Sequence, residues 1–225
     1  MKTGILIQAR LSSSRFPGKM LALLNGIPLI QFVFNRCKVS KHAGIVAVIT
    51  SDQSSDDPLY ECCRNNNIPV FRGGLDNVLD RYVKAAKFFG CDVVCRVCGD
   101  SPFVDICCID QMFKCLKKND EYFSVSGGLN GFISEIVTYQ TLAKVNCLAS
   151  SSEDREHVTK YIRDNLNQFR HRMFDIGSVP EALQRITLTV DYEKDMDLAN
   201  LIVKNGLSGF DFQSQDVIKI LHRIL

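Results

Sequence analysis

Short apolar runs alternate with helical segments along the first half of the chain, and this alternation limits the fold more than any other feature of the sequence. The runs are too short to be helices and are rich in Val and Ile, as buried strands are; they lie at residues 5–9, 45–50, 68–71 and 92–97. Helical signals fill the stretches between them, at residues 27–37, 58–65 and 78–89. Strand, helix and strand in this order pair in parallel, so we predict an α/β fold with a mostly parallel sheet.

The alternation breaks near residue 121. A strand is predicted at 122–125, a glycine-rich turn at 127–131, a helix led by residues 134–139, and a further strand at 169–174. We therefore predict a single domain over residues 1–225, with a small β-rich insertion at about 121–180. After the insertion, residues 186–190 alternate like a strand, and residues 210–225 read as a last amphipathic helix.

The charge balance excludes some classes of partner. Hydrophobic residues make up 46% of the chain, charged residues 23%, and the formal net charge is only +2. We expect no nucleic-acid partner and no membrane partner, because such a small excess of cations favours anions bound in a local pocket. Since no apolar run has the length of a membrane span and the N-terminus lacks a signal-like apolar region, we expect a cytoplasmic protein.

The ten cysteines lie within apolar patterns, as in residues 91–98 and 106–109. Free thiols in such places behave as small hydrophobic residues, and a reducing compartment is consistent with the absence of a secretion signal. Cys95 and Cys98 have the spacing of a zinc-ligand pair, but no second pair follows at a suitable distance. We therefore interpret the cysteines as core residues.

The loop after the first run is the clearest candidate for a binding site. Residues 10–19 hold two arginines, one lysine, three consecutive serines and a Pro-Gly turn signal. Loops at the carboxyl ends of parallel strands are where α/β sheets bind ligands, and guanidinium, ammonium, hydroxyl and backbone N–H donors suit a polyphosphate. A solvated polar loop is the alternative. We favour the ligand, because crowded cations are costly unless an anion neutralises them.

Three further positions follow predicted strands. Arg72 precedes two glycines, at a point where backbone and guanidinium can both approach a ligand, and Asp76 is a candidate cap for the helix beyond. Asp100 directly follows the central strand and suits a divalent metal on nucleotide phosphates, whereas Asp105 is interpreted as a helix cap. Asp191 follows the run at 186–190, and it is either a second metal ligand or a cap of the next helix.

The opening loop is neither a P-loop nor a dinucleotide-binding glycine motif. It resembles the I-Q-A-R-x-x-S-x-R-x-P-G-K signature of the sugar-nucleotide cytidylyltransferases, the family of CMP-sialic acid and CMP-KDO synthetases. The form Gln8-Ala9-Arg10 is most similar to the SpsF-like branch. Four more segments resemble family motifs in the family's order, at residues 71–82, 99–105, 153–159 and 187–198.

The resemblance implies a three-layer, Rossmann-like sheet related to the GT-A fold. It also implies that CMP is transferred from CTP to a sugar acid or to a phosphorylated or phosphonate acceptor, with release of pyrophosphate, for polysaccharide biosynthesis. Catalysis is then expected from Arg10, Arg15, Lys19 and Asp100. Nucleotide contacts are expected from the opening loop, from two arginines with Asp80 orienting one of them, and from the metal-binding aspartate: Ala9, Arg10, Ser12, Ser13, Ser14, Lys19, Arg72, Arg81 and Asp100.

The resemblance further implies acceptor contacts from Glu135 and His157, a homodimer formed through the insertion, and Mg²⁺ as cofactor. We predict that Asp100 and Asp191 share that ion, each at the end of a strand. Two alternatives remain open. A GT-A glycosyltransferase has a similar sheet and an aspartate-bound metal, and a nucleotide-binding module without catalysis has the same sheet. Pyrophosphate release separates both from a cytidylyltransferase.

Overall fold

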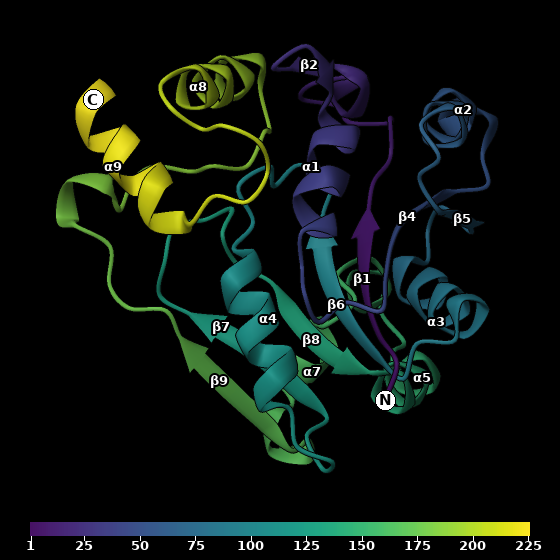
Figure 1. Ribbon diagram of the computed structural model, residues 1–225. Coiled ribbons are helices and arrows are strands. Elements are labelled where there is room, and N and C mark those ends of the chain that lie inside the picture. The colour runs from purple at the N-terminus through teal and green to yellow at the C-terminus, as the bar shows by residue number, and fades with distance from the viewer.

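A computed structural model describes residues 1–225, and its centre is a seven-stranded sheet in the order β5-β4-β1-β6-β8-β7-β9 (Figure 1). Neighbouring strands from β5 to β6 run parallel, β8 runs antiparallel to β6 and to β7, and β9 is parallel to β7. The strands are β1 (Thr3–Gln8), β4 (Ile45–Ser51), β5 (Val70–Gly73), β6 (Val93–Cys98), β7 (Tyr122–Ser126), β8 (Glu135–Thr138) and β9 (His171–Asp175). The predicted mostly parallel α/β sheet is confirmed.

Helices cover both faces of the sheet and make three layers. Side chains of one strand alternate between two cores: Ile5 and Ile7 of β1 pack into the larger one, and Leu6 packs into the other. The larger core is closed by α1 (Leu29–Lys38), α2 (Asp57–Asn65), α4 (Ile106–Cys115), α8 (Glu193–Lys204) and α9 (Ser214–Ile224). The smaller core is closed by α3 (Val78–Phe89), α5 (Tyr139–Leu148) and α7 (Lys160–Asp164).

The segment 121–180 differs from the predicted insertion in how it is built. Its strands β7, β8 and β9 extend the central sheet, because β8 pairs with β6 through Val93↔Thr138 to Arg96↔Glu135. It also contributes helices α5, α6 (Ser152–Glu156) and α7. β8 falls where the sequence predicted the lead-in to a helix: its four residues are too few to show a period of their own.

Two local features differ from the sequence analysis, and in the first of them the prediction is wrong. Residues 186–190 form no strand and make only an isolated bridge between Asn130 and Thr187. A two-stranded hairpin before α1 was also not predicted, formed by β2 (Leu23–Leu24) and β3 (Ile27–Pro28). Both features depend on partners supplied from elsewhere in the chain or on runs too short to carry a pattern.

Helix caps test the predictions residue by residue. Asp105 accepts a hydrogen bond from Cys108 N at 2.9 Å and caps α4, as predicted. Asp76 does not cap α3, because that position is taken by Asn77, whose side chain accepts from Asp80 N at 2.9 Å.

All ten cysteines are free thiols, and five of them are buried: Cys37, Cys63, Cys91, Cys95 and Cys108. Burial raises the pKa of the Cys37 thiol to about 12, so it stays protonated and packs as an apolar group. Cys107, Cys115 and Cys147 are exposed, which contradicts the core interpretation for these three. No group of three or more His, Cys, Asp or Glu side chains is placed to hold a metal, and Cys95 and Cys98 are not part of such a group.

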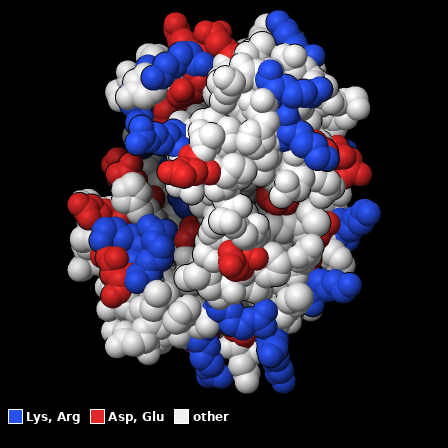
Figure 2. All heavy atoms as spheres, turned by 90° about the vertical axis from the view of Figure 1, so that its left-hand side faces the viewer, with Lys and Arg blue, Asp and Glu red and all other residues white.

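Acidic and basic side chains are interspersed on the face shown in Figure 2, with uncharged surface between them. That distribution agrees with the small net charge of +2. None of the helices combines the length and apolar character that crossing a lipid bilayer requires.

Candidate active site

A cavity of about 400 Å³ lies at the carboxyl ends of β1 and β6, and we call it the first cavity. The opening loop contributes a large part of its wall, as the strand-end argument predicts. Its lining holds most of the predicted nucleotide residues: Gln8, Ala9, Arg10, Ser12, Ser13, Ser14, Arg15, Lys19, Met20, Val78, Arg81, Cys98, Gly99, Asp100, Glu156, His157 and Asp191.

The opening loop is fixed by hydrogen bonds at both of its ends. Leu11 N donates to the carboxylate of Asp56 at 2.7 Å, and Asp56 is fully buried. Gly18 N returns to Leu11 O at 3.2 Å, with Gly18 at φ +73°, a left-handed conformation that glycine adopts without steric cost. Ser13 Oγ accepts from Phe16 N at 3.4 Å. The backbone therefore holds the loop's hydroxyl and cationic side chains around one space.

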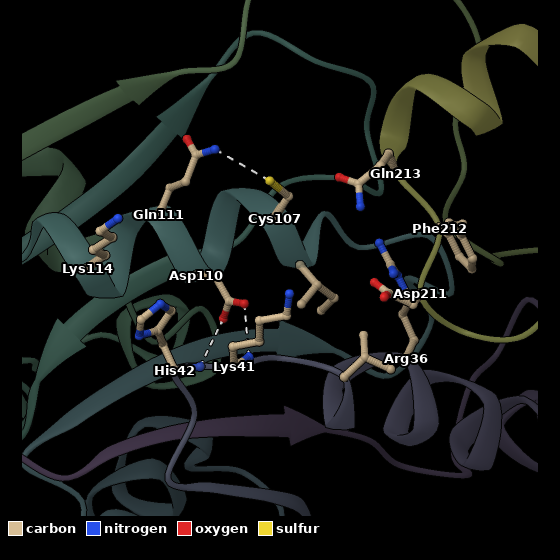
Figure 3. A pocket seen from close by; sticks show the side chains of 12 residues that line it. Arg36, Lys41, His42, Cys107, Asp110, Gln111, Lys114, Asp211, Phe212 and Gln213 are labelled. Atoms are coloured by element: carbon tan, nitrogen blue, oxygen red, sulfur yellow. Dashed lines mark hydrogen bonds between the residues drawn. The ribbon is translucent and has the colours of Figure 1, made fainter.

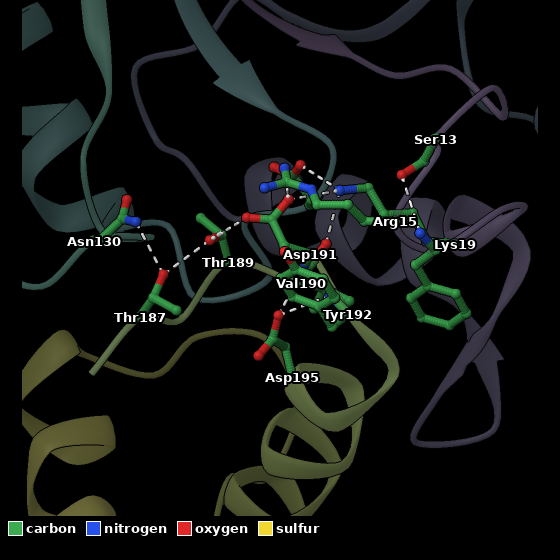
Figure 4. A network of polar contacts seen from close by, with 12 residues as sticks. Ser13, Arg15, Lys19, Asn130, Thr187, Thr189, Val190, Asp191, Tyr192 and Asp195 are labelled. Carbon is green, nitrogen blue, oxygen red and sulfur yellow. Dashed lines mark hydrogen bonds and ion pairs between the residues drawn. The ribbon is translucent and has the colours of Figure 1, made fainter. Parts of the chain in front are cut away.

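Each cation of the loop pairs with a carboxylate of the protein itself, and Figure 4 shows the contacts of Arg15 and Lys19. Lys19 is only 7% exposed, and its Nζ donates to Asp100 Oδ2 at 2.8 Å and to Val190 O at 2.8 Å, and contacts Asp191 Oδ1 at 3.4 Å. Arg15 Nη2 lies 2.6 Å from Asp191 Oδ1. Arg10 Nη2 lies 3.3 Å from Glu156 Oε1. The counter-charge that the crowded cations require is thus provided in part by acidic side chains remote in sequence.

Asp100 and Asp191 lie side by side although 91 positions separate them (191 − 100). Val190 N donates to Asp100 O at 2.8 Å, and this bond brings the two loops together. The predicted setting of Asp191 at a strand end is wrong, because residues 186–190 form no strand. Its alternative role as a cap is not realised either: the Asp195 carboxylate accepts from Asp191 N at 2.9 Å and from Tyr192 N at 2.8 Å.

The donor set at this point suits a small hard cation. Mg²⁺ uses one or two protein carboxylates and completes its octahedron with water and substrate phosphate. Two carboxylates meet here, and no third acidic, histidine or cysteine ligand joins them. Asp100 and Asp191 therefore fit Mg²⁺ better than a metal that needs a cage made only of protein ligands.

The two arginines predicted as nucleotide contacts are placed differently. Arg81 lines the first cavity, is 2% exposed, and donates from Nη2 to Gly74 O at 2.7 Å. Arg72 is not part of the lining: its guanidinium donates to Ser51 O and Gln53 O and pairs with Asp57 at 2.7 Å. The geometry therefore does not support Arg72 as a nucleotide contact.

Asp80 does not orient either arginine, contrary to prediction. Its carboxylate pairs with Lys84 at 2.7 Å and accepts from Asn146 Nδ2 at 3.3 Å. One turn of helix separates Asp80 from Lys84, so Asp80 forms its ion pair with this nearby cation on the same helix face.

A second cavity of about 490 Å³ adjoins the first and shares Cys98 and Asp100 with it. It opens between β6, β7, β8 and β9, and its wall mixes charged, hydroxyl and apolar side chains. The lining consists of Arg96, Cys98, Asp100, Ser101, Tyr122, Ser124, Val125, Asn130, Gly131, Ile133, Ser134, Glu135, Arg163, Leu166, Met173 and Thr189. Asp100 thus stands between the two spaces.

Glu135, a predicted acceptor contact, is a buried hub of the second cavity with 8% exposure. Four side chains donate to its carboxylate: Arg96 Nη1 at 3.0 Å, Thr159 Oγ1 at 2.8 Å, Arg163 Nη1 at 3.1 Å, and Tyr122 OH. With its oxygens already engaged, Glu135 acts through the guanidinium groups that it orients.

Burial alone would raise the pKa of Glu135, but Arg96, the hydroxyl of Tyr122, Arg163 and Thr159 outweigh that effect and hold the pKa below its ordinary value. The carboxylate is therefore ionised. Arg96 and Arg163 both pair with Glu135, so two positive charges face one negative charge. Asp100, the other carboxylate of this cavity, is paired with Lys19 and does not balance the excess.

The sequence contained one usable sign of this hub. Arg96 is a charged residue within an apolar strand run, and a buried arginine needs an anionic partner. No short-range pattern identifies Thr159 or Arg163, because their partner is 24 and 28 positions away.

His157 was predicted beside Glu135 in an acceptor site, and the structure separates the two. His157 lines the first cavity together with Glu156 and Arg10, whereas Glu135 lines the second. Glu156 was not predicted as a site residue. Its contact with Arg10 joins residues 146 positions apart, and no motif spacing reports such a contact.

A third cavity, of about 250 Å³, lies between α4 and the segment before α9, and none of the predicted site residues lines it (Figure 3). Arg36 is buried there, donates to Val104 O and Phe210 O, and stacks on the Phe212 ring at 3.9 Å. Burial lowers the pKa of Arg36 to about 10. These contacts explain Arg36 as a structural link between α1 and the C-terminal segment.

A parallel sheet whose strand ends carry a cationic loop and paired carboxylates defines a nucleotide-binding enzyme of the α/β class. The chain belongs to the cytidylyltransferase family, since a profile of that family, described as Cytidylyltransferase, matches residues 4–205. It is accordingly a CTP-dependent nucleotidyltransferase.

Individual relatives agree with this assignment. The chain is 35% identical over 224 residues to an uncharacterized protein of Methanocaldococcus jannaschii, covering 98% of this chain and 89% of that protein. It is 29% identical over 226 residues to the spore coat polysaccharide biosynthesis protein SpsF of Bacillus subtilis, covering 97% and 93%. The solved structure of a cytidylyltransferase from Leptospira borgpetersenii superposes with a TM-score of 0.90 and 29% identity, over 99% of this chain and 94% of that one. The SpsF-like resemblance is confirmed.

The Glu135 hub predicts how stability depends on pH. A folded pKa below the ordinary value of 4.5 means that Glu135 stabilises the fold above that pH, and that this contribution is lost as the pH falls through the folded pKa. We expect Glu135→Gln, which resembles the protonated state, to cost on the order of 3 kcal/mol at pH 7, because it leaves buried Arg96 without its counter-ion. The difference from wild type should narrow below pH 4.5.

Urea unfolding between pH 3 and pH 7 measures this difference, with Glu181→Gln at an exposed position as the matched control. A gap between wild type and Glu135→Gln that stays constant over that range would contradict an ionised hub.

Proposed function

We propose that the first cavity binds CTP, that the second binds a small anionic acceptor, and that the cytidylyl group passes between them beside Asp100. The single observation that carries this proposal is the shared wall: Cys98 and Asp100 line both cavities. Two substrates that react must meet, and adjoining cavities bring them together without a large motion.

The cations of the opening loop take the triphosphate. Arg15 is half exposed and paired only with Asp191, so a phosphate can replace the carboxylate without burying a new charge. Lys19 is buried and contacts both members of the acidic pair, where it opposes negative charge that builds up on the phosphates. Ser12, Ser13 and Ser14 add hydroxyl donors along the same wall.

The reaction is attack by an acceptor oxygen on the α-phosphorus of CTP. A new P–O bond forms to the acceptor while the bond to the β-phosphate oxygen breaks, and the electron pair of that bond leaves with pyrophosphate. Such phosphoryl chemistry needs little covalent help from the protein, and most of the barrier reduction comes from positioning and from neutralising charge.

Asp100 and Asp191 would hold Mg²⁺. The ion supplies positive charge on the phosphate oxygens when it is bound. The residues' own part is to place two carboxylates beside Lys19, so that the charges of the site alternate in sign.

The acceptor proposed for the second cavity is a sugar acid or a phosphorylated or phosphonate compound. Arg96 and Arg163 leave an excess positive charge after pairing with Glu135, and guanidinium groups bind carboxylate and phosphate well. Hydroxyl and amide groups from Ser124, Asn130 and Thr189 suit a polyhydroxylated ligand. A role in polysaccharide biosynthesis is supported by similarity to SpsF, whose name states that role.

We also propose a homodimer, formed through the 121–180 segment, in the cytoplasm. β9 lies at the end of the strand order, and its Met173 side chain is 60% exposed. A free edge strand with an exposed apolar side chain is a natural pairing surface. Sedimentation at micromolar protein is the measurement, and a monomer there would contradict the dimer.

The opening loop gives a prediction for CTP affinity. We expect Arg15→Ala to raise the KM for CTP roughly tenfold or more, because it removes a charge-assisted contact to phosphate worth about 1.5–3 kcal/mol. Lys19→Ala should lower kcat as well, since Lys19 contacts both acidic residues.

Steady-state pyrophosphate release measures both effects, and Arg64→Ala, an exposed arginine of α2 outside both cavities, is the control. Kinetics like those of wild type in both loop variants would remove this loop from the site.

The acidic pair gives a prediction that separates metal binding from helix capping. Asp191→Asn should lower Mg²⁺-dependent turnover at least about a hundredfold with little change in Tm, as expected when an interaction made in the transition state is lost. Asp195→Ala should do the reverse, costing about 1 kcal/mol of stability through the lost cap and leaving turnover near normal. Near-normal turnover of Asp191→Asn at limiting Mg²⁺ would refute the shared-metal proposal.

A further inference from the structure

The turn between α6 and α7 contains a backbone conformation that its sequence does not favour. Val158 has φ +33°, in the left-handed region, and it is fully buried. A β-branched residue there is a genuine outlier that costs on the order of 1–3 kcal/mol, and such strain persists only where the surroundings fix it.

The residues after the strained position are fixed in the protein interior. Val158 packs in the smaller core, and Thr159 is fully buried and donates to Glu135 at 2.8 Å. Arg163 Nη1 also contacts Thr159 Oγ1, at 2.8 Å. This side of the turn therefore belongs to the hub of the second cavity.

The residues before the strained position face the other way. Glu156 reaches Arg10 at 3.3 Å, and His157 lines the first cavity. Both backbone polar groups of His157 are hydrogen-bonded. Its N–H donates to Glu153 O and its C=O accepts from Lys160 N, each at 2.8 Å. Its imidazole is exposed and makes no hydrogen bond within the protein. The strained turn thus fixes the backbone of His157 and leaves its imidazole, without a hydrogen-bond partner, at the wall of the first cavity.

From this geometry we infer that His157 binds the nucleotide and does not bind the acceptor. An imidazole N–H can donate to a phosphate oxygen or to a ribose hydroxyl, and both are groups that the first cavity holds if the proposed function is right. The second cavity, where the acceptor is placed, does not include His157 in its lining. The inference rests on the proposed assignment of CTP to the first cavity.

Glu156 is consistent with this role. Its pair with Arg10 is half exposed on both sides, 46% and 51%, and such pairs contribute little stability. An incoming phosphate can therefore replace the Glu156 carboxylate on Arg10, which brings the nucleotide next to the adjoining His157.

The test is equilibrium binding of CTP to the full chain in Mg²⁺ without acceptor, followed by steady-state kinetics. We expect His157→Leu to weaken CTP binding about tenfold and to leave the KM for the acceptor unchanged. His157→Gln keeps an N–H donor and should retain most of the affinity. His42→Leu, at an exposed histidine beside the third cavity, is the matched control and should bind CTP as wild type does (Figure 3).

Unfolding curves of the same variants distinguish nucleotide binding from a purely structural role of His157. A structural role would change Tm without changing CTP affinity, and that result would overturn the inference. A higher acceptor KM in His157→Leu with CTP affinity unchanged would also overturn it, and would return His157 to the acceptor. If wild type binds CTP and His157→Leu binds CTP with the same affinity, this inference is refuted and the proposed function is not. A wild-type chain that does not bind CTP refutes the proposed function and the inference with it.

Discussion

The structure depends on one buried ammonium group. Lys19 Nζ joins three segments that lie far apart in sequence: the opening loop, the loop of Asp100, and the segment of Val190 and Asp191, 171 and 172 positions away. Burying an ammonium group without partners is costly, and the two carboxylates and the Val190 carbonyl offset that cost. In turn, Asp100 and Asp191 can lie side by side only because a cation separates their charges. The site is thus held together by opposite charges that come from segments far apart in the sequence.

The same principle organises the second cavity. There a buried anion, Glu135, gathers four donors from β6, β7 and the α6–α7 region, and the guanidinium groups of Arg96 and Arg163 are held by it. One cavity therefore centres on a buried cation and the other on a buried anion, with Asp100 between them. The first presents cations whose present carboxylate partners a phosphate can replace. The second presents fixed positive charge beside hydroxyl groups, so the two cavities differ in charge as the proposed pair of substrates requires.

The sequence predicted those features that are carried by neighbouring residues. Strand runs such as 45–50 and helices such as 78–89 follow from local periodicity, and the opening loop follows from its local crowding of cations. The predicted meeting of Asp100 and Asp191 is confirmed for a different reason than the one proposed, since a loop hydrogen bond between Val190 and Asp100 replaces the expected strand. The differences from prediction have more than one cause. The β8 strand is defined by pairing with β6 across the sheet, and Arg72 donates to Ser51 O, 21 positions away, so no local pattern reports either contact. Asp80 instead pairs with Lys84 one helical turn away, a local contact that helix spacing could have shown.

In the proposed reaction, CTP in the first cavity gives up its cytidylyl group to an acceptor in the second. The most direct measurement is pyrophosphate release by the purified protein with CTP, ATP, GTP or UTP, in Mg²⁺, against a panel of sugar acids and phosphorylated or phosphonate sugars. The account predicts release with CTP and an anionic acceptor, in equal amounts with a CMP-linked product, and loss of that release in Arg15→Ala at low CTP. Release of a nucleoside diphosphate from a nucleotide sugar, with no pyrophosphate from CTP and any acceptor, would contradict it.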